Sequence, residues 1–344
     1  MESLIEKLKR KLGRARASHE GRQVAVAAFG KHPGWDDHMD DIGLESDMLV
    51  AAKRLLYLRG IGENIDSGRW SDLEARQSSI EFGHTFVWCR NEAIVAGRLW
   101  PSEDGRGRTR YPMIVCADCR AIPLRTAYER VLPHLADLET RCRHSNSAQE
   151  VRTATSECQR ALAGFSDRLN VPEEERATRV DPVARLATYS ELGPGEEGLL
   201  RVLYHIDREI PVGSSPLKLK GTWMRPGQIS QHSVLVRVPV SANHVPEAPI
   251  LWTRLLLDKY GQQCGVLALI PQGKTWLDLI VGEPTPAQLY CLRASTEALP
   301  PATAVPYNIS PEFAENVRGR LAAARTNTAG TGDRCRAAEN HETK

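Results

Sequence analysis

Two segments, one in each half of the chain, have the pattern of a β-hairpin. In residues 82–100, FGHTFVWCRNEAIVAGRLW, apolar side chains alternate on either side of a turn at Arg90-Asn91-Glu92. In residues 264–282, the runs CGVLALIP and KTWLDLIVG are joined by Gln272-Gly273. Apolar runs that are broken by turn residues predict paired strands. Hairpins are incompatible with a strictly doubly wound parallel sheet, so antiparallel pairing is expected in both halves.

Further strands and several helices are expected around these hairpins. Apolar runs at 24–29, 111–118 and 232–240 predict strands. Helical spacing predicts helices at 44–58, within 123–165, at 196–206, at 249–261 and at 311–324, with the glycine-containing stretch 60–73 as a loop. The expected fold class is α/β (α+β), with a mixed β-sheet flanked by helices and two sheet-containing units.

The length of 344 residues is sufficient for two cores. We expect a basic amphipathic leader at 1–22, an α/β domain at 23–167, a second α/β unit at 182–310 and a disordered tail at 325–344. The charged residues 171–181 have the composition of a linker or a solvated turn.

The composition limits the classes of function. Apolar residues make up 41% and charged residues 26%, and the net charge is +2, which argues against a strongly basic nucleic-acid-binding protein. No apolar run has the roughly 18–20 residues of a membrane span, and the N-terminus lacks the pattern of a secretory signal. We therefore expect a cytoplasmic protein whose eight cysteines are thiols.

The lone pair Cys116 and Cys119 has CxxC spacing, but without a second pair it is weak support for zinc.

The leader is the most basic part of the chain. Residues 1–22 hold seven Lys/Arg and three Glu, and Leu4, Ile5, Leu8 and Leu12 fall on one helical face. Two interpretations stay open. Residues 1–16 are either an arm that makes a weak contact with a membrane or an acidic surface, or a solvated start of the chain.

The loop after the first strand, FGKHPGWDDHMDD (residues 29–41), holds histidines and carboxylates together. His32, Asp36 and His38 supply nitrogen and oxygen ligands that suit Zn, Fe or Mn, and with Asp37 and Asp104 they would form the site of a metal-dependent hydrolase. The spacing matches no zincin or calcium-loop pattern. Acidic residues that precede a helix also serve as caps.

Phosphate chemistry is a weaker hypothesis. Gly30-Lys31 lacks the preceding glycines and the following Ser or Thr of a P-loop. The run Gly105-Arg106-Gly107-Arg108 is too short for a dinucleotide fingerprint. Its arginines are suited to bidentate contacts with acidic groups, either in a partner or in this chain.

Two motifs taken together resemble the TagF (ImpM) family of type VI secretion accessory proteins. The first is FGKHPGWDD at 29–37, and the second is RLWPSEDGRGRTRYPMIV at 98–115. The matching positions are Gly30, Lys31, Pro33, Asp36 or Asp37, Pro101, Ser102, Asp104, Gly107, Arg108, Tyr111 and Pro112. The match covers about residues 23–120, and this chain resembles a divergent member.

The resemblance implies a non-enzymatic bacterial protein that tunes a contractile secretion machine through protein contacts, with no cofactor and no catalytic residues. Glycines and prolines fix the loops at 30–37 and 101–112. If the two loops lie side by side, Asp104 and Arg108 pair with Lys31 and with Asp36 or Asp37 in a buried or half-buried network. The expected role of these residues is to shape a binding surface, and the alternative is the metal-dependent hydrolase.

Overall fold

The computed structural model describes residues 24–91, 93–163, 181–193, 196–209, 233–261 and 264–323. The expected leader (1–22) and tail (325–344) therefore lie outside the described residues, as does most of the linker at 171–181. Within the described ranges, no helix has the length and apolar character that crossing a membrane takes.

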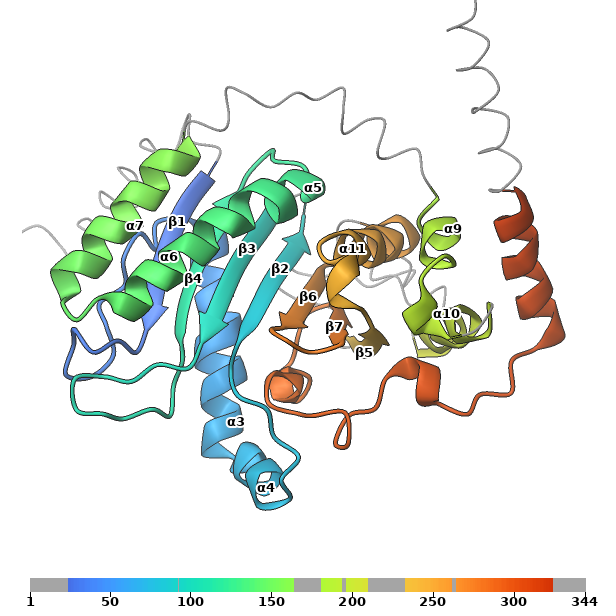
Figure 1. Ribbon diagram of the computed structural model, residues 1–344, viewed down its shortest axis with the longest axis horizontal. Coiled ribbons are helices and arrows are strands. Elements are labelled where there is room, and N and C mark those ends of the chain that lie inside the picture. The colour runs from blue at the N-terminus through green and yellow to red at the C-terminus, as the bar shows by residue number, and fades with distance from the viewer. Residues whose placement is uncertain are drawn as a thin grey trace, which may run out of the picture.

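Strands from both halves of the chain form one seven-stranded sheet (Figure 1). The order is β1-β4-β3-β2-β6-β7-β5, and every ladder is antiparallel. The strands are β1 (Val24–Gly30), β2 (His84–Arg90), β3 (Ala93–Trp100), β4 (Met113–Cys119), β5 (Val234–Pro239), β6 (Val266–Pro271) and β7 (Trp276–Val281).

The α/β (α+β) class with flanking helices is thus confirmed, but two details of the expectation were wrong. The sheet is antiparallel rather than mixed, and the two expected sheet units are joined because β2 pairs with β6, from His84 opposite Pro271 to Cys89 opposite Val266. The physical reason lies in burial. Apolar side chains cover both faces of β2 and β6, and an unpaired edge on such strands would leave buried N–H and C=O groups without partners.

Helices cover both faces of the sheet, and side chains alternate between the two layers. Along β1, Val24, Val26 and Ala28 enter one core, while Ala25, Ala27 and Phe29 enter the other. The first core is covered by α5 (Leu124–Thr126), η2 (Ala127–Val131), α6 (Leu132–His144), α7 (Ala148–Ala163), α9 (Pro182–Leu186), α10 (Glu197–Glu209) and α11 (Glu247–Tyr260). The second is covered by α2 (Asp47–Ala52), η1 (Lys53–Gly62), α3 (Glu63–Asp66), α4 (Arg69–Ala75) and η6 (Leu289–Leu292). Short helical turns η4 (Ser190–Leu192), η5 (Ala242–His244) and η7 (Ala302–Ala304) connect these elements.

The expected helix at 44–58 continues further than its sequence suggests. It runs from α2 through the π-helical η1 into α3, so Gly60 lies inside the helix and does not end it. A Cβ at Gly60 would lie 2.4 Å from Cδ1 of Leu289. The glycine therefore permits close contact with η6. From local sequence rules alone, a glycine at this position predicts the end of the helix.

Candidate functional site

The two motif-bearing loops leave the sheet at neighbouring points. β1 ends at Gly30, β4 begins at Met113, and these two residues face each other in the antiparallel ladder. The Lys31 amide donates to the Pro112 carbonyl at 3.2 Å. Gly30 has φ +123°, and a Cβ there would lie only 2.4 Å from that same carbonyl oxygen, so the position requires glycine. The loops after β1 and before β4 consequently start side by side.

The carboxylate of Asp104 organises the second loop. The side chain is buried, and its Oδ1 accepts from the backbone amides of Arg106 at 3.0 Å and Arg108 at 3.1 Å. Its Oδ2 accepts from Nε of Arg108 at 2.8 Å and also from Nζ of Lys31 in the first loop. Gly107, at φ +73°, turns the chain so that both amides point at the carboxylate. Four donors thus hold one acid.

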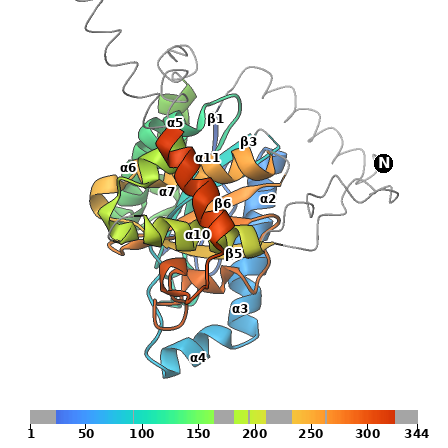
Figure 2. The ribbon, with the colours of Figure 1, turned by 90° about the vertical axis from the view of Figure 1, so that its right-hand side faces the viewer.

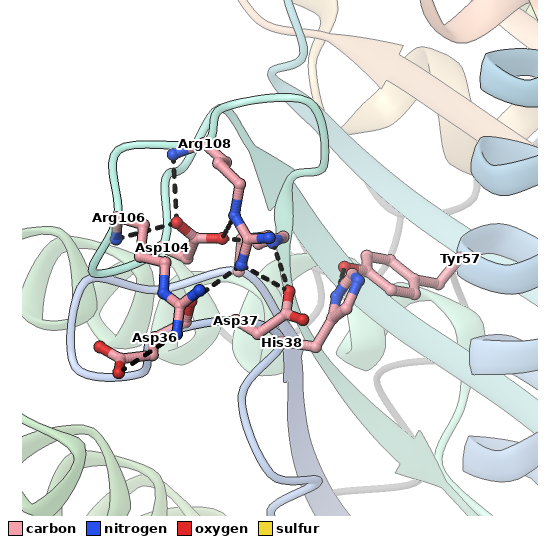
Figure 3. Close-up of polar contacts among 8 residues, drawn as sticks. Asp36, Asp37, His38, Tyr57, Asp104, Arg106 and Arg108 are labelled. Carbon is pink, nitrogen blue, oxygen red and sulfur yellow. Dashed lines mark hydrogen bonds and ion pairs between the residues drawn. The ribbon is translucent and has the colours of Figure 1, made fainter.

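The same lysine and arginine tie the loops together. Nζ of Lys31 also donates to Asp37 at 2.8 Å. The guanidinium of Arg108 donates to the Asp36 carbonyl at 2.8 Å and lies 3.0 Å from Oδ1 of Asp37 (Figure 3). The Gly105 amide donates to the Trp35 carbonyl at 2.7 Å. The expected pairing of Asp104 and Arg108 with Lys31 and with Asp36 or Asp37 is present in the structure. We call this set, Lys31, Asp36, Asp37, Asp104, Arg106 and Arg108, the loop network.

The loop network has a buried centre and an exposed rim. The side chains of Lys31 and Asp104 are 5% and 0% exposed, whereas those of Asp36, Asp37 and Arg106 are 83%, 64% and 66% exposed. Arg106 approaches Asp36 only to 3.8 Å. The rim thus presents charges of both signs to solvent, and the buried ion pair of Lys31 and Asp104 holds the loops beneath it in place.

The two carboxylates that contact Lys31, the buried Asp104 and the exposed Asp37, are both held in the charged form. Burial acts to raise the pKa of Asp104, but hydrogen bonds from Lys31, from the two backbone amides and from Arg108 outweigh it and hold the pKa well below its usual range. The Lys31 hydrogen bond likewise lowers the pKa of Asp37. Neither acid is suited to exchange protons near neutral pH, as a general acid or base must.

The residues proposed as alternative metal ligands, His32, Asp36 and His38, do not converge on one point. His32 is buried, and its Nδ1 accepts from the Gly34 amide at 3.0 Å. Its Nε2 must then carry the proton that is donated to the Cys142 carbonyl at 3.0 Å, so neither nitrogen is free for a metal. Burial lowers the pKa of His32, in keeping with a neutral ring. Nδ1 of His38 lies 2.8 Å from the Tyr57 hydroxyl (Figure 3), and in the described residues no three His, Cys, Asp or Glu side chains are arranged to hold a metal ion.

The remaining motif residues frame the loops without joining the loop network. Pro33 and Pro101 are exposed, Ser102 is half-buried and Pro112 is buried. Pro101 and Pro112 restrict the backbone at the two ends of the second loop, and Pro33 does so within the first.

Sequence reasoning did not predict an aromatic cluster beside the network. The rings of His38, Tyr57 and Tyr111 lie within 5.7 Å of one another, and Phe29 packs edge-on against Tyr57 at 5.9 Å. These residues come from β1, from the two loops and from η1. Tyr111 stands in the second motif, but nothing in the sequence indicates that Tyr57 faces it.

The first loop is also anchored to α7. Arg152 of α7 pairs with Asp40 at 2.7 Å and lies over the Trp35 ring at 5.8 Å. Gly34 lies against the start of α7, where a Cβ would come within 2.5 Å of the Ala148 amide nitrogen. The loop is therefore fixed on two sides, by the second loop and by a helix.

The CxxC pair cannot act as a unit. Cys116 and Cys119 are three residues apart in β4, and they belong to the cores on opposite faces of the sheet. Both are free thiols, and burial raises the pKa of each. They behave as small apolar side chains.

Comparison with known proteins adds little. No protein-family model matches the chain, and no curated protein is similar to it at a significant level. Among solved structures, the chain is similar to PA0076 from Pseudomonas aeruginosa PAO1, with a TM-score of 0.31 and 19% sequence identity. The match covers 39% of this chain and 62% of PA0076, less than two thirds of its length. A similarity of this degree carries no argument about fold or function.

Proposed function

We propose that this chain is a non-enzymatic regulatory protein of the TagF (ImpM) kind, which acts in the bacterial cytoplasm by contact with components of a type VI secretion machine. The observation that carries the proposal is that Lys31, Asp104 and Arg108, three residues of the resemblance, are the ones that tie the two loops together. The contact surface is the exposed rim, made by Asp36, Asp37, Arg106 and Arg108.

Electrostatics supports a binding role over a catalytic one. Proton transfer needs an acid or base with a free position and a pKa near ambient pH, whereas Asp104 is saturated with donors and strongly acidic. Two loops that are held rigidly and carry charges of both signs instead favour recognition of another protein by shape and charge. The loop backbone is already ordered, so it loses little conformational freedom on binding. No cofactor and no nucleic acid enter this proposal. A contact of residues 1–16 with a membrane or an acidic surface stays a prediction.

Binding measurements with purified proteins test this function. The sheath, inner-tube and forkhead-associated scaffold proteins encoded nearest to the gene would be immobilised in turn, and binding of the full chain would be followed by biolayer interferometry. We expect one of them to bind, and Asp36→Ala and Arg106→Ala each to slow association and to weaken that binding about fivefold, because charges at the rim act mainly on the rate of association. Both side chains are exposed, so the fold should not change.

Arg160→Ala is the matched control. Like Arg106, Arg160 of α7 is an exposed arginine that lies 3.8 Å from a carboxylate, here that of Glu157. It lies twelve residues along α7 from Ala148, which is about 18 Å from the place where the first loop meets this helix. Equal effects of Arg106→Ala and Arg160→Ala, or no binding to any of the three proteins, would contradict the proposal. Near-stoichiometric Zn, Mn or Fe that is lost in His38→Ala would favour the hydrolase instead.

A further inference from the structure

The last described helix, residues 311–323, is attached to the body by a narrow apolar stripe. Ser310 caps it, accepting from the Phe313 amide at 3.2 Å. Ala314 and Leu321 are buried and Phe313 and Val317 are half-buried, while the other helix positions are exposed. This is the spacing of an amphipathic helix that lies in a groove. Figure 2 shows the helix (red) crossing in front of α10 and α11.

Hollows lie on both sides of this stripe. One, of about 1080 Å³, lies between the helix and residues that include Tyr189, Glu196 and Leu200. The other, of about 430 Å³, is mainly apolar and lies between Val317 and residues of α10 and α11 that include Leu203 and Leu255. Both hollows are open to solvent, so they are parts of a surface groove and not voids in the interior. The helix therefore fills only part of the groove in which it lies.

The polar contacts of the helix define the charge of the groove. Arg320 makes a bidentate pair with Asp181 at 2.9 Å, and Arg318 lies 3.8 Å from Glu196. The acidic partners belong to the body and the arginines to the helix. The groove thus combines an apolar floor with an acidic rim, and its occupant is an amphipathic helix with arginines beside the stripe. Exposed pairs of this kind contribute little to stability.

The helix is also weak by its own sequence. Gly319 lies in its interior at an exposed position, and a Cβ there would meet nothing within 4 Å. Glycine in a helix interior is unfavourable relative to alanine, and here no packing requires it. Helices with few buried contacts open locally at low free-energy cost.

We propose that the groove formed by α9, α10 and α11 is a docking site for an amphipathic helix of a partner protein that carries arginines beside its apolar stripe, and that helix 311–323 is a displaceable strap that occupies the groove in the free chain. The argument rests on charge complementarity and on the seated helix as a template for the occupant. It is independent of the loop network, so either proposal can fail alone.

The test uses the full chain and a fluorescent peptide with the sequence of residues 308–324, carrying Gly319→Ala to favour the helix. Two versions of the chain are compared: the unaltered one, and Gly319→Pro, which breaks the strap without touching the groove. In the unaltered chain the strap is tethered beside the groove at high effective concentration and competes with the peptide for it. We therefore expect the peptide to bind Gly319→Pro at least about tenfold more tightly than the unaltered chain. A peptide with Arg318→Glu and Arg320→Glu should bind neither.

Hydrogen exchange of the unaltered chain gives a second readout, which does not depend on whether the Gly319→Pro variant folds. Amides of 314–321 should exchange faster than those of α10, and addition of the peptide should quicken exchange in 314–321 while protecting α10. Exchange of 314–321 as slow as that of α10, or equal affinity of the peptide for both versions of the chain, would overturn the proposal. Tighter binding by a peptide of residues 2–16 would assign the groove to the leader of this chain and also overturn it.

Discussion

Lys31 and Asp104, 73 residues apart in the sequence, form a buried ion pair that joins the loop after β1 to the loop before β4. Both loops leave the sheet at adjoining strands, so the pair requires no long excursion of either loop. A buried charge pair contributes to stability only when hydrogen bonds satisfy both ions. Here Asp104 has four donors, and Lys31 has the second acceptor Asp37.

The two arginines of the second loop should differ in their effect on stability. Arg108 contacts Asp104, Asp37 and the Asp36 carbonyl, and about half of its side chain is exposed. Its replacement by alanine is expected to lower the free energy of unfolding by about 1 kcal/mol. Arg106 makes only a long contact with Asp36, so Arg106→Ala should stay within roughly 0.5 kcal/mol of the unaltered chain. Urea denaturation measures both, and equal effects would show that Arg108 is not a structural member of the network.

Gly30 should be far less replaceable than another glycine with positive φ. Gly30→Ala brings a Cβ within 2.4 Å of the Pro112 carbonyl oxygen, whereas at Gly68, with φ +73°, nothing lies within 4 Å. We expect Gly68→Ala to cost about 1 kcal/mol of stability, from backbone strain alone, and Gly30→Ala roughly 3 kcal/mol. Thermal melting compares the two. The clash is refuted if the melting temperatures fall equally.

His84 should make stability depend on pH. Burial, together with Arg237, lowers the pKa of His84 to about 3, whereas in the unfolded chain it is about 6.5. Between these values the unfolded chain binds a proton that the folded chain does not, so stability falls as pH falls through this window. The loss is about 1.4 kcal/mol per pH unit below about 6.5.

The measurement is urea denaturation between pH 7.5 and 5. Other histidines, such as His32 and His38, also have lowered pKa values and add to the slope. The variant His84→Leu isolates one contribution, because the difference between its slope and that of the unaltered chain belongs to His84. Identical slopes would mean that the imidazole is accessible to protons in the folded chain.

Local patterns in the sequence predict most strands but not how they are ordered. The hairpin of β2 and β3 and the strands β6 and β7 follow from alternation and turn residues. The pairing of β2 with β6 joins segments about 180 residues apart, and no short-range signal specifies which edges meet. The same limit explains why two sheets were expected where one is formed.

The residues of the loop network other than Arg106 were predictable because the resemblance pointed to them, whereas the pairing of β1 with β4, which brings the two loops together, was not. The buried pair of Arg237 and Asp278 was not predictable either. Both side chains are fully buried on β5 and β7, and Arg237 also donates to carbonyls of residues 294, 295 and 299. In the sequence these two residues stand in apolar strand patterns as single charges, and only the register of the two strands makes them neighbours.

A double-mutant cycle on Lys31 and Asp104 tests most directly whether the two loops form one rigid unit. Free energies of unfolding would be measured for Lys31→Ala, Asp104→Ala and the double variant. Each single change leaves one buried charge without its partner, so each should destabilise strongly, and the double variant should lose clearly less than the sum of the two. Strictly additive losses would contradict this, because they would mean that the two side chains do not interact and that nothing at the centre holds the loops together.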